Sequence, residues 1–285
     1  MQPNKARGIV LGSRRIHGWF SPEAAMLFAW IDEIQKLNGI VGDVFEIGCH
    51  HGKSTVLIGA MVSARKERIC VCDLFGDQGA NVSGSGQGDL EIFRRNMGPM
   101  LETGVEMRVH QKNSNALSVG EIGGSFRFFH IDGGHSSAEA LSDLRLAARS
   151  VIDSGVIALD DAFNSEWPGV TEALIRFLDE FHQFSAIIVG FNKALITRTS
   201  SASLYLKEMQ RTEMLDSFGL GFPWRIRLLT FCANPLRVLY MPSELAARKM
   251  TLFARKYYET HKCLRSRPLT PLVWVTKAIL RRCKV

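Results

Sequence analysis

Acidic side chains follow two short apolar runs of this chain, at the points where the runs end. Asp132 closes the run Phe128-Phe-His-Ile, and Asp160 and Asp161 close the run Gly155-Val-Ile-Ala-Leu. If these runs are neighbouring parallel strands, three carboxylates meet at the carboxyl edge of a sheet, where open α/β folds bind their ligands. His135, three residues after Asp132, brings an imidazole to the same edge. This combination predicts a functional site rather than a core.

The residue types indicate the chemistry of that site. Three carboxylates with water suit a hard octahedral cation, so Mg²⁺ is preferred and Mn²⁺ comes second. Such an ion lowers the pKa of a bound hydroxyl, and a histidine is suited to accept the proton. A structural alternative stays open, in which Asp160 and Asp161 cap a strand end and His135 opens the following helix.

A second polar motif, Val44-Phe-Glu-Ile-Gly-Cys-His-His-Gly-Lys-Ser-Thr55, indicates a strand, a tight turn and the start of a helix. Gly48 and Gly52 allow the backbone to approach a ligand. A P-loop needs one more residue between its first glycine and the Gly-Lys-Ser, and a dinucleotide fingerprint needs a glycine where His50 stands. Both spacings argue against those ligands and leave S-adenosylmethionine as the third.

S-adenosylmethionine carries an ammonium, a carboxylate and a ribose, and the motif offers a partner for each. We expect Glu46 to bind the ammonium and Ser54 the carboxylate. Asp73 ends the next predicted strand, where an acid accepts hydrogen bonds from two ribose hydroxyls. The neighbouring His50 and His51 suggest another metal site, but adjacent side chains usually diverge, so we expect them to form a polar wall instead.

The elements that must position these residues follow from the apolar pattern. A helix is predicted from Ser21, with Pro22 at its first position, to near Asn38-Gly39. Strands are predicted over 43–47, 68–72, 105–110, 126–131, 156–159, 186–189 and 194–197, and helices near 53–64, 89–101, 136–150 and 168–182.

This alternation predicts a Rossmann-like, doubly wound α/β fold with a mostly parallel seven-stranded sheet. The short link Gly190-Phe-Asn-Lys193 makes the last strand antiparallel. Between Asp73 and Asp89 a glycine-rich stretch without periodicity predicts a lid over the site. We divide the chain into an N-terminal helical segment (1–40), the α/β domain (41–200) and a basic, mainly helical C-terminal extension (201–285).

Composition bounds the class of protein. The 285 residues are 46% hydrophobic and 22% charged, and no apolar run is long enough to span a bilayer, which predicts a cytoplasmic globular protein. Residues 224–285 hold 14 Lys or Arg against two acidic residues, a net charge of +12. This segment suits an anionic membrane surface or an acidic partner, or it forms a solvated basic cap. We expect no nucleic-acid partner, and self-association is left open.

From about Phe45 to Thr197 the chain resembles class I S-adenosylmethionine-dependent methyltransferases of the methyltransferase domain 24 kind. The motif Glu46-Ile-Gly-Cys-His-His-Gly, Asp73, Ile131-Asp-Gly-Gly-His and Ala158-Leu-Asp-Asp carry the likeness. It is most similar to the branch with catechol-type and macrolide-sugar O-methyltransferases. In that branch Ser114 and its neighbours match the loop that borders the adenine.

The resemblance implies a metal-assisted O-methyltransferase acting on a small hydroxylated acceptor, such as a sugar, a glycosylated metabolite or a phenol. By position, Asp132, Asp160 and Asp161 match the metal ligands, and His135 matches the general base. Asp132 also borders the cofactor. Two rivals remain, namely an atypical Mg²⁺-dependent NTPase that uses Gly52-Lys-Ser-Thr55, and a non-catalytic scaffold recruited through its basic tail.

Overall fold

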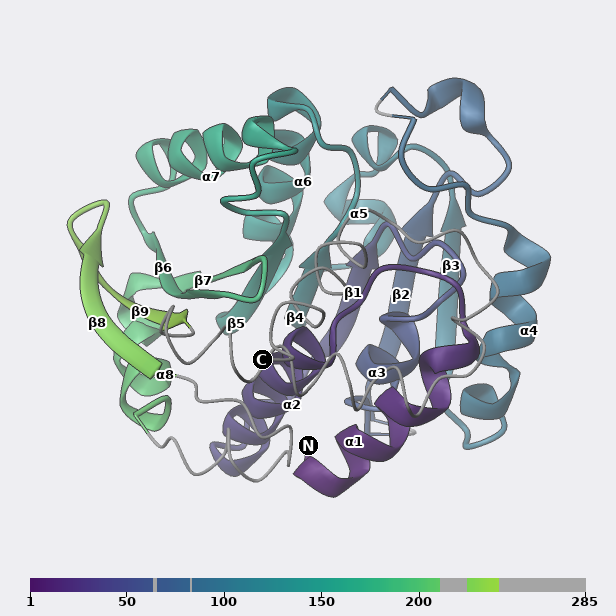
Figure 1. Cartoon of the computed structure of the whole chain (residues 1–285), viewed down its shortest axis with the longest axis horizontal. Helices are drawn as coiled ribbons and strands as arrows, with labels where there is room; N and C mark the ends of the chain where they lie inside the picture. The colour runs from purple at the N-terminus through teal and green to yellow at the C-terminus, as the bar shows by residue number, and fades with distance from the viewer. Residues whose placement is uncertain (64–65, 83, 211–224, 241–285) are drawn as a thin grey trace, which may run out of the picture. The chain divides into compact units, whose positions relative to one another are not determined.

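The computed structural model describes residues 1–63, 66–82, 84–210 and 225–240 (Figure 1). These residues form a nine-stranded sheet in the order β3-β2-β1-β4-β5-β7-β6-β9-β8. The strands are β1 (Asp43–Ile47), β2 (Arg68–Asp73), β3 (Glu106–Gln111), β4 (Phe126–Ile131), β5 (Val151–Asp160), β6 (Phe184–Gly190), β7 (Lys193–Arg198), β8 (Arg225–Phe231) and β9 (Asn234–Tyr240). The helices are α1 (Pro3–Gly12), α2 (Pro22–Leu37), α3 (Thr55–Gly59), α4 (Leu90–Leu101), α5 (Val119–Ile122), α6 (Ser137–Ser150), α7 (Pro168–Glu180) and α8 (Ala202–Glu208).

The first seven strands confirm the predicted doubly wound sheet. Strands β1 to β5 run parallel to one another, and β7 lies antiparallel between β5 and β6. Phe191 and Asn192 join β6 to β7 with φ of +56° and +66°, the left-handed backbone of a two-residue hairpin turn. Because β7 turns back beside β5, its first residue Lys193 pairs in register with Asp160 at the carboxyl edge.

The C-terminal extension differs from the prediction. Residues 225–240 were expected in a mainly helical segment, but they form a β-hairpin whose strand β9 pairs parallel with β6. The turn residues Cys232 and Ala233 have φ of +46° and +60°, as a tight hairpin requires. The strong positive charge of the whole segment hid the period-two pattern Arg225-Ile-Arg-Leu of an edge strand.

The chain divides into one compact unit, Met1–Gly219 with Ile226–Leu239, and a second unit, Leu220–Arg225 with Tyr240–Val285. The second unit lies almost entirely outside the described residues. The predicted divisions after residues 40 and 200 therefore stay predictions.

Capping residues fix where the helices that flank the site begin. The Ser21 hydroxyl accepts a hydrogen bond from the Ala24 amide at the start of α2. Ser136 and Glu139 form a reciprocal capping box at the start of α6. The residues just before α6 are thereby held at the sheet edge, and His135 is one of them.

Helices cover both faces of the sheet. On one face α6 and α7 contribute to the core that contains Phe45, Phe129 and Ile157. On the other face α2 packs on the sheet through Phe28, whose ring lies 4.9 Å from that of Phe128. Figure 1 shows these helix groups on opposite sides of the strands. Because both faces are covered, ligands reach the sheet only at its edges.

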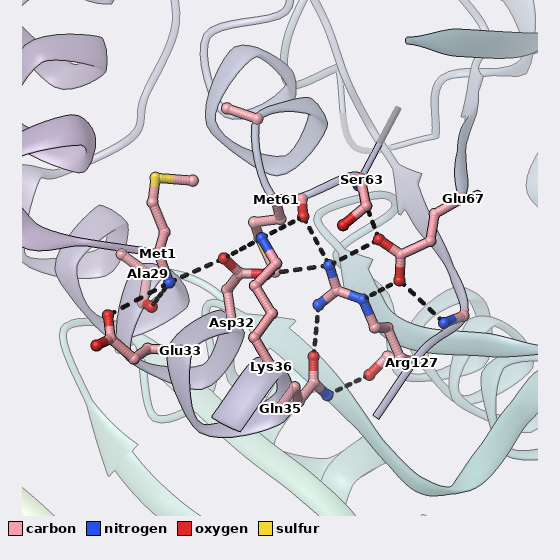
Figure 2. Close-up of polar contacts among 12 residues, drawn as sticks. Met1, Ala29, Asp32, Glu33, Gln35, Lys36, Met61, Ser63, Glu67 and Arg127 are labelled. Carbon is pink, nitrogen blue, oxygen red and sulfur yellow. Dashed lines mark hydrogen bonds and ion pairs between the residues drawn. The ribbon is translucent and has the colours of Figure 1, made fainter. Parts of the chain in front are cut away.

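A buried ionic network joins α2 to the amino-terminal end of β4, away from the acidic strand ends (Figure 2). The Arg127 side chain is fully buried and donates to Glu67 at 2.7 Å, to Gln35 at 2.7 Å and to the Met61 carbonyl at 2.8 Å. It also lies 3.0 Å from Asp32, which receives the Met1 amino group at 2.8 Å. Burial raises the pKa of Glu67, but Arg127 and the amides of Gly42 and Ser63 together outweigh this effect and lower it. Glu67 thus stays ionised beside Arg127 inside the protein.

Candidate active site

The carboxyl ends of β2, β1, β4 and β5 lie next to one another, so the loops that follow them meet at one edge of the sheet. The glycine turn after β1 contacts the backbone after β4 directly. Gly48 has φ of +80°, and a Cβ there would overlap the carbonyl oxygen of Asp132. Only glycine therefore lets the predicted cofactor turn lie against the strand end that carries the first acid.

Gly52 closes the same turn in a left-handed conformation with φ of +89°. A Cβ there would overlap the Met97 side chain of α4. Ser54 is buried directly before α3, a helix of only five residues, which is shorter than the predicted helix over 53–64. The turn is thus packed closely against α4.

Glu46 lies beneath this turn rather than in it. Its side chain is fully buried, one oxygen accepts from the Thr55 hydroxyl at 2.5 Å, and the other lies 3.0 Å from His130 Nδ1. The predicted contact of Glu46 with an ammonium stays a prediction. In the structure Glu46 ties β1 to the start of α3.

Asp73 ends β2 beside the turn and is half-buried. Its two oxygens accept from the amides of His50 and Phe75, each at 2.7 Å. Burial is the largest influence on this carboxyl and raises its pKa, although both amides oppose the shift. Each carboxylate oxygen has a second lone pair, so Asp73 can still accept from ribose hydroxyls.

Ser114 lies in a short turn after β3, next to the buried Asp143 of α6. Burial raises the pKa of Asp143 to about 7, although the Ser114 side chain opposes the shift. Asp143 Oδ2 also lies close to Gly133, where a Cβ would come within 3.0 Å of it. The loop predicted to border the adenine and the loop that follows Asp132 therefore meet at this carboxyl.

The acidic strand ends meet as the sequence predicted. Ligand atoms of Asp132, His135 and Asp161 lie within 4.8 Å of one another, and so do those of His130, Asp132 and Asp160. Burial raises the pKa of Asp132 well above its usual value, and Asp160 raises it further. The carboxyl groups thus crowd together so closely that Asp132 favours its neutral form, and a cation at this point would favour the ionised form.

Asp160 and Asp161 are adjacent but point to different partners. Asp161 has φ of +55°, a left-handed conformation that aspartate tolerates better than most residues. This turn in the backbone directs its Oδ2 to His135 Nε2 at 3.1 Å, whereas Asp160 forms an ion pair with Lys193. Burial would raise the pKa of Asp161, but hydrogen bonds from His135, Asn164 and Asn192 outweigh it and lower the pKa.

His135 is held on three sides. Besides its contact with Asp161, its Nδ1 lies 3.0 Å from the Ser85 hydroxyl. The Trp167 ring stacks on the imidazole with centroids 4.1 Å apart and planes 16° apart. The ring is fixed by these contacts, and one nitrogen faces a carboxylate while the other faces the glycine-rich loop.

That loop lies over both ends of the site. Gly88 passes close to Asp73, Gly86 lies near His50, and Ser85 reaches His135. This placement agrees with the predicted lid, since the loop contacts the residues of the cofactor end as well as those of the acidic end.

Lys193 and Asn192 are site residues that the sequence reading missed. Lys193 is 4% exposed and contacts Asp160, and Asn192 donates a hydrogen bond to Asp161. A signal was available in the sequence. An antiparallel last strand that pairs with β5 begins beside the end of β5, so its first residues face the acidic pair.

The predicted contact of residues 224–285 with a membrane surface or an acidic partner lies outside the described residues except for 225–240, and it stays a prediction. Within the part of the chain that the structure describes, no helix is long and apolar enough to cross a membrane.

Comparisons with known proteins agree with this architecture. Residues 45–162 match a family model described as a methyltransferase domain. The O-methyltransferase NovP is similar with a TM-score of 0.52 and 17% identity, over 64% of this chain and 83% of that one. A Podospora anserina methyltransferase, PaMTH1 bound to SAH, aligns with a TM-score of 0.47 and 13% identity, over 69% and 88% of the chains. No curated protein matches the sequence.

The family match favours S-adenosylmethionine among the ligand classes that were considered for the glycine turn. It spans β1 to the end of β5, and thus includes the turn, Asp73 and all three acids of the edge. Residues 45–162 thus match a methyltransferase domain, which agrees with a methyltransferase enzyme that uses S-adenosylmethionine.

Proposed function

We propose that this methyltransferase transfers the methyl group to a hydroxyl oxygen of a small acceptor, with His135 as the general base. The observation that supports this most is the His135–Asp161 pair, 3.1 Å apart, beside Asp132, whose backbone packs against Gly48 of the cofactor turn. Methyl transfer to oxygen needs a proton acceptor within reach of the acceptor hydroxyl. His135 is the side chain of this edge best suited to that task.

The contacts of His135 suggest which nitrogen acts. Asp161 accepts from Nε2–H and so holds the proton on that nitrogen, which leaves the lone pair of Nδ1 free. The Ser85 hydroxyl lies 3.0 Å from Nδ1 and marks the position for the acceptor hydroxyl. When an acceptor enters, the lid serine gives up this position and Nδ1 takes the proton of the acceptor.

The cofactor would be held by the turn from Gly48 to Ser54, by Asp73 and by the loop at Ser114. When bound, S-adenosylmethionine supplies the electrophilic methyl group. Glu46 supports this turn from below through its contacts with Thr55 and His130.

The acidic edge fits a divalent cation. Asp132, Asp160 and Asp161 bring three carboxylates together, and the only lysine that the structure places on them, within its described residues, is Lys193 on Asp160. Asp132 and Asp161, with the second oxygen of Asp160, would hold Mg²⁺ or Mn²⁺. The ion would lower the pKa of the acceptor hydroxyl and fix its position.

The acceptor class follows from the surroundings of the base. Trp167 stacks on His135 and offers an aromatic wall next to the reacting position, as suits a sugar ring or a phenol. NovP offers a precedent for O-methylation on this fold. We therefore propose a sugar, a glycosylated metabolite or a phenol as acceptor.

The test is a methyl-transfer assay with labelled S-adenosylmethionine and a panel of sugars, phenols and glycosides. We expect an O-methylated product. Its rate of formation should fall after treatment with EDTA and recover when Mg²⁺ is added, and the product should not form with His135→Ala. Transfer to nitrogen or carbon acceptors alone would contradict the proposal. If activity survives both EDTA and Asp160→Ala, the proposal of a metal ion is wrong, whereas the assignment as an O-methyltransferase still stands.

The same samples test both rivals. Calorimetry with ATP and with S-adenosylhomocysteine should show binding of the latter only. Tight ATP binding would favour the NTPase, and S-adenosylhomocysteine binding without turnover of any acceptor would favour the scaffold.

A further inference from the structure

Three histidines gather above the cofactor turn, outside the acidic edge. His17 comes from the segment between α1 and α2, and His50 and His51 come from the turn after β1. Their ring centroids lie 5.4 Å apart for His17 and His50, 5.8 Å for His17 and His51, and 3.9 Å for His50 and His51. One ligand nitrogen from each lies within 4.8 Å of the other two.

The backbone explains why two adjacent side chains face the same point. His50 has φ of +48°, a left-handed conformation in which histidine is enriched among residues other than glycine. In extended or helical backbone, neighbouring rings diverge, which was the basis for expecting a polar wall. The left-handed backbone at His50 instead turns both rings toward the same point.

Three ring nitrogens of His50 and His51 are available to a ligand. Among the described residues, His50 Nδ1 and both ring nitrogens of His51 are buried without a hydrogen-bond partner. Buried polar atoms of this kind are rare unless something satisfies them. Burial lowers the pKa of His50 to about 4, helped by the neighbouring imidazoles, and it also lowers the pKa of His51. At neutral pH both rings are in the uncharged form that binds metals.

We propose that His17, His50 and His51 form a binding site for one Zn²⁺ ion. Three imidazoles with a fourth, open position suit Zn²⁺, whereas the hard carboxylates of the acidic edge suit Mg²⁺. Asp73 and Asp89 interact electrostatically with His51 and offset part of the charge of the ion. This site does not depend on the proposed methyl transfer.

The ion would fasten the segment around His17 to the cofactor turn. In the structure the two are already linked by ring contacts, by Lys53, which donates to the Gly18 carbonyl at 2.8 Å, and by an interaction of His50 with the His17 backbone. His50 is also the residue whose amide donates to Asp73, and Gly86 of the lid lies beside its ring. A metal at this point joins the N-terminal segment to the turn that carries the ribose acid.

Zinc titration of the full chain, by calorimetry and by competition with a chromophoric chelator, tests the site. We expect one Zn²⁺ per chain. His17→Ala and His51→Ala each remove a direct ligand of the ion. Loss of a residue that only supports a ligand weakens metal binding roughly 10–100-fold, so the zinc affinity of these two variants should fall by more than that. The matched control is His182→Ala, because His182 is an exposed histidine outside the cluster. Asp161→Asn is the control for zinc that binds at the acidic edge instead. It should leave the zinc affinity of the histidine cluster unchanged.

Two further readouts protect the test from misfolded variants. His17 is exposed, so His17→Ala should fold normally, and in this variant the visible spectrum of tetrahedral Co²⁺ should disappear. Zn²⁺ should slow tryptic cleavage at the exposed Arg14 and Arg15 in the wild type but not in His17→Ala. The proposal is overturned if no zinc binds, if His17→Ala binds zinc as the wild type does, or if only Asp161→Asn loses it.

Discussion

The role of Asp161 can be tested by comparing two substitutions at this position. In the proposed mechanism Asp161 acts through His135, by holding a proton on Nε2 at 3.1 Å. Asp161→Ala removes the carboxylate. Asp161→Asn removes the charge and also presents an NH₂ group to Nε2, because its oxygen stays with the donors Asn164 and Asn192. The amide therefore favours the tautomer that places the proton on Nδ1, the wrong nitrogen.

The magnitudes differ enough to be measured. Loss of one charge-assisted hydrogen bond costs roughly 1.5–3 kcal/mol, which is about 10–150-fold in kcat if the whole of it is felt in the transition state. Reversal of the tautomer can cost about 10⁴-fold, as in serine proteases. We therefore expect Asp161→Asn to be slower than Asp161→Ala. If the bond of Asp161 to the metal matters more to the rate than its bond to His135, the order is the opposite, since an amide oxygen still coordinates Mg²⁺ and a methyl group does not.

Initial rates at saturating cofactor and Mg²⁺ measure this order, and a double-mutant cycle with His135→Ala measures the coupling. If Asp161 acts through His135, substituting Asp161 in the His135→Ala variant should lower the rate only a little further. Higher activity in Asp161→Asn than in Asp161→Ala, together with additive losses in the cycle, would refute the orienting role and assign Asp161 to the metal alone.

Three other predictions concern stability and the cofactor turn. Arg127→Met leaves the buried carboxylates of its network unpaired and should lower the free energy of unfolding by about 3–5 kcal/mol in urea denaturation, whereas Arg145→Met, which breaks an exposed pair, should not shift the midpoint. Equal effects of the two would contradict the network. Gly48→Ala should abolish S-adenosylhomocysteine binding in calorimetry because its Cβ has no room, and Gly120→Ala, where nothing lies within 4 Å, should bind normally. Binding by Gly48→Ala would show that the turn can open. Asp143 has a pKa raised from 3.8 to about 7, so the folded state keeps a proton that the unfolded state loses, and stability falls as pH rises from 3.8 to about 7. Asp143→Asn should remove that decline and gain up to about 4 kcal/mol above pH 7, with no gain near pH 4; a gain that does not vary with pH would contradict this assignment.

Most of the fold could be predicted from the sequence because the local patterns of apolar and turn residues agree with the overall arrangement of strands and helices. Apolar runs fixed the seven strands, and the short link at Phe191 and Asn192 predicted the antiparallel last strand. The pattern failed over residues 225–240, where the net charge of a long basic segment concealed an edge hairpin. The hairpin is held beside β6 by pairing between residues far apart in the sequence, such as Val189 with Val238. The local sequence of either strand does not indicate this pairing.

The site was predictable where it depends on strand ends and not where it depends on backbone conformation. Asp132 and Asp160 meet because parallel strands end at one edge, which follows from the order of elements. The position of Glu46 beneath the turn could not be read from the chain, because it depends on how Thr55 and His130 pack around it. His50 and His51 were expected to diverge, and only the positive φ of His50 reverses that expectation.

The antiparallel strand β7 connects the fold to the chemistry of this edge. Its reversal places Lys193 opposite Asp160 and Asn192 beside Asp161, so each of the two adjacent acids receives its own partner. Lys193 offsets one negative charge of the cluster, and Asn192 holds Asp161 in the orientation that faces His135. Asp132, between them, receives neither partner directly and has its pKa raised by burial and by Asp160. Asp132 is thus the acid of the cluster whose ionised form a bound cation would stabilise most, and its backbone contacts Gly48 of the cofactor turn.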